Sequence, residues 1–533
     1  MKRINSLMKK RGVTALIAIT AGMMLPHAVL AEEVTLKSSD GTVNIVGDYV
    51  DFVDDHYVVR TALGDLRITA SRVRCEGAAC PVFETTSAGV KIAGSDTVGL
   101  GLMPLLMSGY ASHLDAEASI VATETAGEVL ANFIGDGGFG DELGSYLVTS
   151  TSSGDAFKTL QAGSAEIGMA SRRIKPAEAR ELKADGAGNM VSPNQEHIVA
   201  VDSLVVVTHP SNPIDILKKS QIQDIYSGKI TNWSAVGGDD VPIKVVTRQD
   251  GSGTRSVFED RIFLDDEATL SGNAVVVDGN NEMAAMVNED AGAFGYVGYA
   301  FQRGAKPLTI INHCGITMVP DAFSAKTEEY ALQRRLYMYT REDSLSAEGQ
   351  TFVDYVKSEA ADGVIAKAGF IELGVSKRVQ SLDSPRARAL LDPNADRFET
   401  GVRQEMLTQM STFDRLSTTF RFRTGSSLLD ERGTLDMGRL ADYLETMPQG
   451  TKVQFIGFTD SVGAFESNRA LSIGRAGSVQ KDILKLAGDR LSHIEMSHNG
   501  FGEIAPSTCN TDEHGRSVNR RVEVWIGKEA SSS

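Results

Sequence analysis

The sequence has little of what a metal centre, a disulfide scaffold or a nucleic-acid interface requires. Its 533 residues include four cysteines and nine histidines. The histidines show neither a His-x-His nor a His-Glu-x-x-His spacing, so we predict no metal site and no cofactor. Basic residues are the minority, with 53 Lys and Arg against 70 Asp and Glu, a net charge of -17. A chain this acidic lacks the electrostatic footprint of a nucleic-acid or anionic-membrane binder.

Long apolar runs are also scarce, and the one near the N-terminus is too short to span a bilayer. Five basic residues precede the apolar run Val13–Leu25, and small side chains stand at Val29 and Ala31. This order is typical of a secretory signal peptide over residues 1–31, with an uncleaved anchor as the alternative. No later stretch reaches 18 apolar residues, so we expect an exported mature chain without a transmembrane segment.

Export changes how the four cysteines are interpreted, because disulfides persist outside the reducing cytosol. Cys75 and Cys80 enclose only Glu-Gly-Ala-Ala, a loop short enough for one local disulfide. Cys314 and Cys509 lie in distant segments, and the sequence leaves open whether they pair or stay as buried free thiols.

Three segments of different periodicity follow the signal and predict a multidomain protein. Residues 32–86 alternate apolar and polar side chains between Asp-Gly and Gly-Asp turns, which predicts a small β-rich module, a spacer or docking unit. Residues 88–373 alternate helices with continuous apolar runs, the pattern of an α/β fold with buried strands. Residues 374–411 are charged and contain two prolines, which indicates a partly helical linker. Residues 412–529 are again α/β, with a basic turn leading into an edge strand near Val522–Ile526.

In the second segment, three Ser/Thr/Gly turns stand directly before apolar helices. They begin at Gly94, Thr151 and Gln249. Helix N-termini carry unsatisfied N–H groups and partial positive charge, and serine and threonine hydroxyls add donors. One such turn is usually a simple helix cap. Three in one domain, with Arg248 and Arg172 close to them in the chain, predict a cleft that holds a tetrahedral oxyanion.

Five short sequence motifs in this segment together resemble the signature of a protein family. They are Gly94–Thr97, Ile167–Arg172, Ile222–Trp233, Arg248–Thr254 and Gly292–Gly298. With them, the segment resembles the periplasmic phosphate-binding proteins of ABC transporters. The resemblance implies two lobes that close on phosphate, and an ABC permease as a candidate partner. By motif position, it implies that the anion is bound by Ser95, Thr97, Ser153, Gly154, Arg172, Arg248, Ser252, Gly253 and Thr254.

Arg172 marks a departure from the family pattern. The transport proteins have an Asp at this position, and it accepts the proton of hydrogen phosphate. A cation still suits an oxyanion, but the acceptor is missing unless Asp96 or Asp250 supplies it. We therefore expect phosphate or a similar oxyanion, with weaker discrimination against sulfate.

The last segment carries charged residues in a recognisable order. Asp460 ends a strand, Asn468–Ala476 opens a helix, and Gly515–Val524 is a basic turn before a strand. In this order they resemble the OmpA-like peptidoglycan-binding domain, although Phe458 stands where the family usually has His. The resemblance implies binding of diaminopimelate, whose ammonium and carboxylate match an acid and a guanidinium held together. It assigns these roles to Asp460 and Arg475, in a pocket lined by Asn468, Leu471 and Arg521.

The sequence therefore predicts a small β module, a two-lobed α/β periplasmic-binding-protein fold and an α/β OmpA-like domain. We expect a phosphate or oxyanion binder tethered non-covalently to peptidoglycan in the periplasm of a Gram-negative bacterium. An enzyme is disfavoured, because there is no Gly-x-Ser-x-Gly elbow and no His beside the Ser252 turn. The remaining alternative is a wall tether or adaptor whose middle domain has lost or changed its ligand and docks a protein partner.

Overall fold

The computed structural model describes residues 33–37, 44–53, 56–62, 64–69, 73–77, 79–80, 88–123, 125–263, 269–391, 397–422, 429 and 431–528. The predicted signal peptide, residues 1–31, lies outside the described residues. The chain divides into two compact units, Met1–Glu84 and Thr85–Ser533. Within the described ranges, no helix combines the length and the apolar character needed to span a bilayer.

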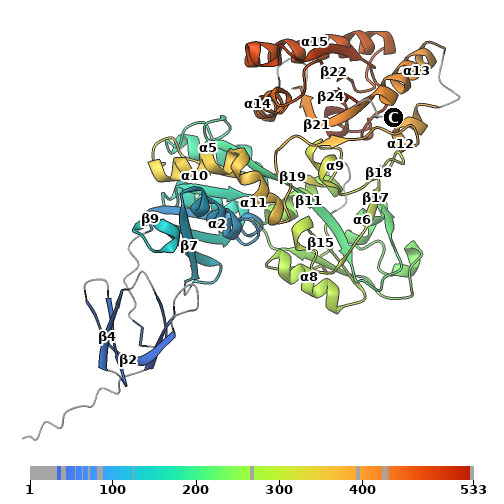
Figure 1. Ribbon diagram of the computed structural model, residues 1–533. Coiled ribbons are helices and arrows are strands. Elements are labelled where there is room, and N and C mark those ends of the chain that lie inside the picture. The colour runs from blue at the N-terminus through green and yellow to red at the C-terminus, as the bar shows by residue number, and fades with distance from the viewer. Residues whose placement is uncertain are drawn as a thin grey trace, which may run out of the picture. The chain divides into compact units, whose positions relative to one another are not determined.

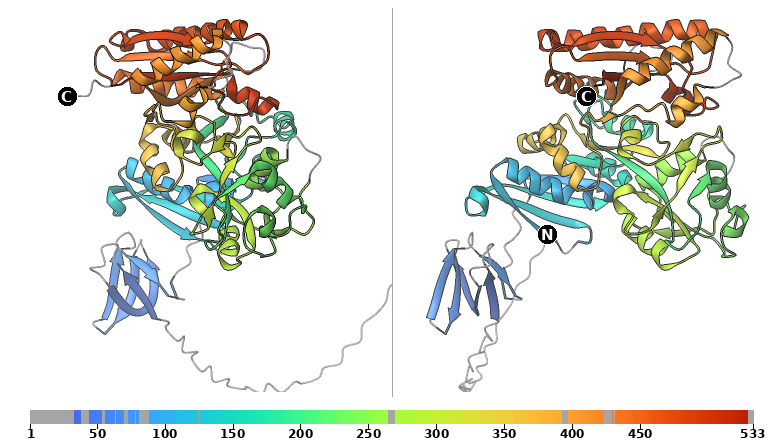
Figure 2. Two further views of the ribbon diagram at one scale, coloured as in Figure 1. Left: turned by 90° about the vertical axis from the view of Figure 1, so that its right-hand side faces the viewer. Right: turned by 45° about the vertical axis from the view of Figure 1, so that its right-hand side comes forward.

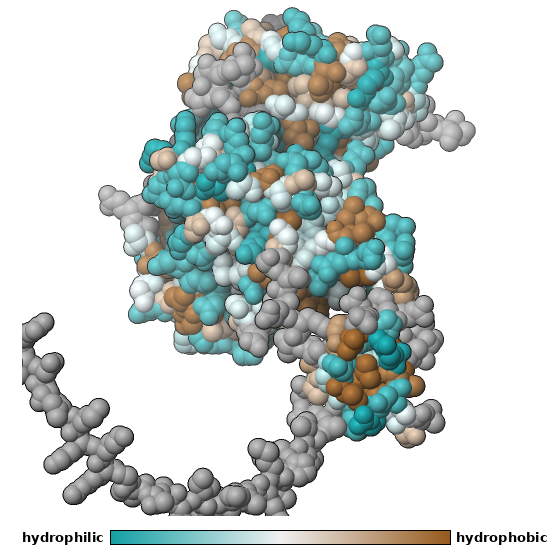
Figure 3. All heavy atoms as spheres, turned by 90° about the vertical axis from the view of Figure 1, so that its left-hand side faces the viewer, coloured by the Kyte–Doolittle hydropathy of each residue, from teal (hydrophilic) through white to brown (hydrophobic). Residues whose placement is uncertain are grey.

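The N-terminal unit contains one antiparallel sheet in the order β4-β3-β2-β1-β5. Its strands are β1 (Glu33–Lys37), β2 (Asn44–Val53), β3 (His56–Thr61), β4 (Gly64–Thr69) and β5 (Arg74–Glu76). Cys75 and Cys80 form the predicted local disulfide. The core is small and centres on Val34, Leu36, Tyr57, Val59 and Val73. Apolar residues also remain on the surface of this module, as Figure 3 shows, and they include the exposed Val46, Val50 and Val53 of β2.

The larger unit is built on a long mixed sheet in the order β14-β13-β15-β11-β19-β10-β6-β9-β8-β7. Its first lobe contains β6 (Val90–Ser95), β7 (Ala116–Ala122), β8 (Glu128–Ile134), β9 (Glu142–Thr151) and β10 (Ile167–Ala170). Its second lobe contains β13 (Lys244–Arg248), β14 (Val275–Val277) and β15 (Ala293–Gly298). The long strands β11 (Glu196–Thr208) and β19 (Gln333–Thr340) pair with each other between the lobes. β11 and β19 therefore connect the two lobes (Figure 1).

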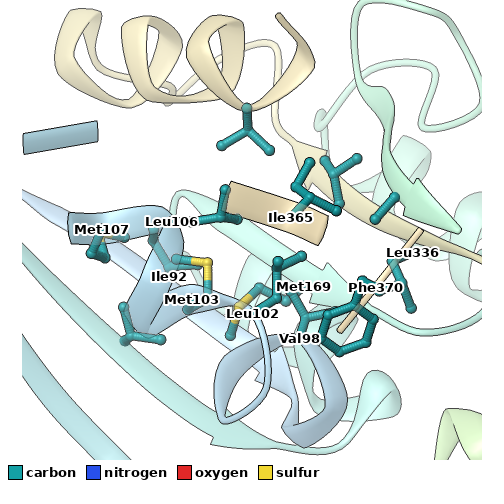
Figure 4. Packing of buried hydrophobic residues seen from close by; sticks show 14 of the residues in the cluster. Ile92, Val98, Leu102, Met103, Leu106, Met107, Met169, Leu336, Ile365 and Phe370 are labelled. Carbon is teal, nitrogen blue, oxygen red and sulfur yellow. The ribbon is translucent and has the colours of Figure 1, made fainter. Parts of the chain in front are cut away.

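Helices cover both lobes, as the continuous apolar strands predicted. The first lobe carries α1 (Asp96–Gly99), α2 (Met103–His113), α3 (Gly135–Gly138), α4 (Ser153–Gln161), α5 (Pro176–Ala184), α10 (Ala347–Lys357) and α11 (Asp362–Lys367). The second lobe carries α6 (Lys219–Tyr226), α7 (Gly253–Ile262), α8 (Asn280–Glu289) and α9 (Ala322–Lys326), with the short strands β12 (Ile216–Lys218), β16 (Lys306–Pro307), β17 (Thr309–Ile311) and β18 (Thr317–Met318). Figure 4 shows the core of the first lobe, where Leu106 of α2, Met169 of β10, Ile365 of α11 and Leu336 of β19 gather.

The C-terminal domain has a sheet in the order β20-β21-β24-β22-β23. Its strands are β20 (Lys377–Arg378), β21 (Phe413–Arg421), β22 (Lys452–Gly457), β23 (Glu495–Gly500) and β24 (Arg521–Gly527). Its helices are α12 (Pro385–Ala389), α13 (Arg397–Thr412), α14 (Glu431–Glu445), α15 (Phe465–Ala487) and α16 (Glu513–Asn519). Figure 2 shows α14 and α15 together on one side of this sheet.

The structure differs from the sequence prediction at two places in this domain. β24 is not an edge strand, because it pairs with β21 on one side and β22 on the other. Residues 374–411, predicted as a partly helical linker, do contain α12 and most of α13, but they also belong to the domain, because β20 extends the sheet and Leu390 and Met406 share a core with Phe458 and Trp525. One of the charged residues that suggested a linker, Arg386 of α12, instead pairs with the buried Glu523 of β24.

The C-terminal domain is fastened to both lobes. Cys314, in the β17–β18 loop, is bonded to Cys509, which decides the pairing that the sequence left open. Glu328, just before β19, forms ion pairs with Arg421 of β21 and Arg432 of α14. On the first lobe, Arg439 of α14 binds Asp362 at 2.8 Å. The interface therefore places the C-terminal domain across the connection between the lobes.

Candidate functional site

The three turns singled out in the sequence converge between the lobes. Each connects a strand to a helix: β6 to α1, β9 to α4 and β13 to α7. Ser152 and Ser252 cap α4 and α7 by accepting N–H groups of their own first turns. Ser95 precedes α1, but its side chain makes no capping bond. Gly94 has a φ of +137°, and a side chain there would collide with the backbone of β10, so the first turn requires glycine.

Residues from opposite lobes touch at this point. The hydroxyls of Thr97 and Thr254 lie 3.4 Å apart. The N–H of Gly154 donates to the carbonyl of Gly251 at 3.3 Å. A Cβ at Gly253 would run into the hydroxyls of two serines of the first lobe, so only glycine allows this approach. The predicted ligands from the three turns are thus brought into one cradle, as the sequence expected.

Several buried donors in the cradle have no partner among the described residues. Arg248 is completely buried at the end of β13. Its Nη2 donates to the carbonyl of Asp278 at 2.7 Å and to Asp96 Oδ2 at 3.2 Å. Its Nε and Nη1, and the hydroxyl of Ser95, make no hydrogen bond within the described part of the chain. Because buried polar groups are nearly always paired, these donors point to a ligand that accepts hydrogen bonds.

Tyr296 holds the backbone of Arg248 in place through a hydrogen bond. Its hydroxyl lies 2.9 Å from Thr247 Oγ1 and accepts the N–H of Arg248 at 3.4 Å. Its ring stacks on Phe258 of α7, with centroids 4.0 Å apart. Burial raises the pKa of Tyr296 to about 12, so the phenol stays neutral. The position of Arg248 is therefore set by the core of the second lobe.

Two residues considered from the sequence do not lie in the cradle. Arg172 donates to both carboxylate oxygens of Glu178, at 2.8 and 2.6 Å, and lies over the ring of Phe157. Asp250 pairs with Arg255, and its side chain is 97% exposed. The structure therefore separates Arg172 from the other predicted ligands. Of the two acids suggested as a replacement acceptor, it brings only Asp96 to the site.

Three further residues of the cradle were missed by the sequence analysis: Asn280, Asp202 and Arg334. Asn280, at the start of α8, donates to Asp96 and to Thr97. Asp202 and Arg334 form an ion pair at 2.7 Å on the two connecting strands, with side chains 1% and 2% exposed. One signal could have found the pair, because Asp202 interrupts the apolar run of β11, and a buried acid needs a partner.

A second candidate site lies in the C-terminal domain around Asp460, at the end of β22. Its Oδ2 accepts from Arg520 at 2.8 Å, and the side chain of Asn468 donates to its backbone carbonyl. Arg475 of α15 is part of the same group. Burial first, and then the charge of Arg520, lower its pKa, while Asp460 acts in the opposite direction. Its Nη1 is buried without a partner among the described residues. Leu471, one turn earlier, is half exposed.

Arg521, predicted from the sequence as a ligand, takes a different position. It is fully buried and donates to Glu523 at 2.8 Å and to the carbonyl of Ala505 at 3.0 Å. Arg520, its neighbour, is the residue that faces Asp460. Arg520 lies at the C-terminal end of α16, immediately before β24, whereas Arg521 is the first residue of the strand. No group of three or more possible metal ligands occurs in the part of the chain that the structure describes.

Comparisons with known proteins agree with this division of the chain. The model of the PBP superfamily domain matches residues 84–360, and the model of the OmpA family matches residues 421–520. The phosphate-binding protein PstS of Bacillus subtilis is 27% identical over 225 residues, which cover 42% of this chain and 70% of that protein. PstS of Borreliella burgdorferi is 25% identical over 184 residues, 33% of this chain and 65% of that protein.

Solved structures were matched to both parts. An ABC-type phosphate transport receptor from Vibrio cholerae is 26% identical, with a TM-score of 0.38, and the match covers 53% of this chain and 99% of that one. The periplasmic domain of Helicobacter pylori MotB is 22% identical, with a TM-score of 0.20, over 23% of this chain and 77% of that one.

Proposed function

This chain belongs to the PBP superfamily and carries a C-terminal OmpA domain, and from this premise we propose that it binds phosphate between its lobes while its C-terminal domain holds it to peptidoglycan. The curated relatives matched by the middle segment are named phosphate-binding proteins. On this proposal the mature chain works in the periplasm of a Gram-negative bacterium, associated with the cell wall. An ABC permease that receives the anion is the expected partner.

The observation that carries the proposal is the set of unpaired buried donors. Arg248 presents Nε and Nη1, and Ser95 presents its hydroxyl, in a cradle that also contains the hydroxyls of Thr97 and Thr254. A tetrahedral oxyanion offers acceptors in all directions and would satisfy these donors together. An apolar or cationic ligand would leave them unsatisfied, at a cost of about 1–3 kcal/mol for each group.

Asp96 supplies the acceptor that position 172 lacks. Both of its contacts, from Arg248 and from Asn280, go to Oδ2. Oδ1 can therefore accept the proton of hydrogen phosphate, which sulfate does not carry at neutral pH. On this assignment the protein distinguishes phosphate from sulfate even though Arg172 replaces the family's acid.

Calorimetry on the mature chain tests the proposal, after unfolding and refolding to remove bound anion. We expect phosphate to bind, and Arg248→Gln to weaken binding by about ten- to a hundredfold through loss of charge-assisted hydrogen bonds. Asp96→Asn should raise the affinity for sulfate relative to phosphate. Arg172→Gln is the matched control, because its guanidinium is held by Glu178 and should leave the phosphate affinity unchanged.

Two results would contradict these assignments. If neither anion binds to the refolded wild-type chain, the middle domain is not an oxyanion receptor, and a wall tether becomes the better description. If Arg172→Gln weakens binding as much as Arg248→Gln while both variants keep the thermal midpoint of the wild type, the cradle has been assigned to the wrong cation.

The wall-binding part of the proposal rests on Asp460 and Arg475. The carboxylate would pair with the ammonium of diaminopimelate, and Arg475, with one buried nitrogen still unpaired, would bind its carboxylate. Arg520 holds Asp460 in place from the other side. Paired charges of this kind suit reversible binding of a zwitterion.

A further inference from the structure

A buried ion pair beneath the cradle contacts hydroxyls from both lobes. Arg334 of β19 donates from Nε and Nη2 to Asp202 Oδ2 of β11, at 2.9 and 2.7 Å. Its Nη1 donates to Thr254 Oγ1 at 2.7 Å, and its Nη2 also reaches Thr97 Oγ1 at 3.4 Å. The pair therefore sits on the connecting strands and touches one predicted ligand of each lobe.

The room for this pair is built into the fold. A Cβ at Gly298 would lie 2.8 Å from Asp202 Oδ2 and 3.2 Å from Arg334 Nη2, so the position favours glycine. Asp202 Oδ1 accepts the N–H of Ser203 at 2.8 Å, which fixes the carboxylate. Because the acid neutralises the guanidinium, Arg334 adds hydrogen-bond donors to the cradle without adding net charge.

These contacts restrict what the two threonine hydroxyls can do. A guanidinium only donates, so each hydroxyl that meets Arg334 must accept there. Thr97 Oγ1 also accepts from Asn280 Nδ2 at 3.1 Å. With its acceptor capacity in use, its proton is left to donate elsewhere. The two hydroxyls are 3.4 Å apart, long for an O–H···O bond, and only one of them could donate in that contact.

We propose that Arg334, held by Asp202, is a positioning residue that orients the hydroxyls of Thr97 and Thr254 and leaves Thr97 only its proton to offer the bound anion. The inference rests on the proposed function, because it concerns the selectivity of the same cradle. Asp96 Oδ1 is then the carboxylate acceptor for the proton of hydrogen phosphate, whereas a second proton, on dihydrogen phosphate, would face a donor at Thr97.

The first test is a double-mutant cycle on phosphate affinity. The ion pair is replaced as a unit by Asp202→Leu with Arg334→Met, because removing one partner alone would leave a buried charge. We expect this pair variant and Thr254→Val each to weaken binding about tenfold. If Arg334 acts through the hydroxyl, the combined variant should also lose about tenfold, whereas independent effects would multiply to about a hundredfold.

The second test is the pH dependence of binding, which a merely structural role would not alter. Between roughly pH 8 and pH 5.5, phosphate gains its second proton, and the affinity of the wild type should fall with the fraction of hydrogen phosphate. In the pair variant, the freed hydroxyls can accept a proton, so the profile should flatten. Arg334→Lys, which keeps a donor-only cation beside Asp202, should retain the steep profile.

The outcomes separate this inference from the proposed function. If wild type binds phosphate but the cycle is additive, or the pair variant keeps the steep pH profile, then Arg334 does not position the hydroxyls and only this inference fails. If the pair variant does not fold, Arg334→Lys decides alone, because a flattened profile in that variant would overturn the inference. If the refolded wild type binds no anion, the proposed function fails first and this inference fails with it.

Discussion

Removing the carboxylate of Glu328 should weaken the attachment of the C-terminal domain more than any surface substitution. Three guanidiniums converge on this one acid. Arg335 lies 2.5 Å away, Arg432 3.1 Å and Arg421 3.3 Å. Arg335 belongs to β19, while the other two belong to the C-terminal domain, so the acid joins the two parts. Glu328→Gln keeps the side-chain volume but removes the charge that compensates the three cations.

The expected size follows from burial. The side chain of Glu328 is only 10% exposed. Breaking a buried ion pair by removing one partner typically costs about 3–5 kcal/mol, because the other charge stays buried without compensation. Asp442→Asn, on α14 of the C-terminal domain, is the control. It breaks a surface pair with Arg490, of which both side chains are about half exposed, and such pairs contribute about 0–1 kcal/mol.

The lowered pKa of Glu328 also predicts in which direction its contribution to stability changes with pH. Burial alone would raise the pKa of Glu328, but Arg335, Arg421 and Arg432 hold it far below the ordinary value of 4.5. The stabilisation is therefore fully present above that ordinary value and is lost as the pH falls below it. The difference in unfolding free energy between wild type and Glu328→Gln should be constant near neutrality and shrink by about 1.4 kcal/mol per pH unit in acid.

Fluorescence in urea measures the effect. The chain has two tryptophans, and in a Trp233→Phe background Trp525 reports on the C-terminal domain alone. We expect its transition to move to clearly lower urea in Glu328→Gln and to stay in place in Asp442→Asn. The reasoning is refuted if the two variants shift equally, or if the shift caused by Glu328→Gln is as large at pH 3.5 as at pH 7.

Two further predictions concern the disulfides and the wall. Replacing Cys314 and Cys509 by alanine removes a bond between residues 195 apart in sequence, which should cost about 5 kcal/mol by chain entropy. Loss of the short Cys75–Cys80 disulfide of the N-terminal unit should cost only about 2 kcal/mol. Urea unfolding with and without reductant compares the contributions of the two disulfides. Asp460→Asn and Arg475→Gln should each abolish sedimentation with purified sacculi, since an unmatched ligand charge costs about 2–5 kcal/mol. Retention of both variants would place the tether elsewhere.

The sequence predictions were most accurate for features that a short stretch of residues determines by itself. The continuous apolar run of β11 and the Ser/Gly turns before α4 and α7 are local patterns, and local patterns determine strands and helix starts. Both resemblances were carried by short strings, and family models match the same two regions. Cys75 and Cys80 were paired correctly because the loop between them is short enough to be closed by one local disulfide.

What the sequence could not predict depends on which side chains pair with one another in the folded chain. Arg172 was expected in the cradle, but Glu178, six residues later, binds it and turns it away. Arg334 carries no local signature, since its partners Asp202 and Thr254 are contributed by other elements. Motif position also gave no indication that Arg520, at the end of α16, pairs with Asp460 while Arg521 is buried against Glu523.

The electrostatics of the cradle bear on how so acidic a chain could hold the anion that we propose. Both guanidiniums in it have a carboxylate partner: Asp96 binds Arg248 and Asp202 binds Arg334. The local net charge is therefore close to zero, and attraction between opposite charges contributes little. On the proposed function, directed and buried donors would supply the binding, and salt screens such buried contacts less than exposed ones. Directed donors also distinguish ligands by where protons lie, which a simple positive patch cannot do. The pairing of each cation in the cradle with an acid would therefore account for two properties together. One is selectivity among anions, and the other is anion binding by a chain with a negative net charge.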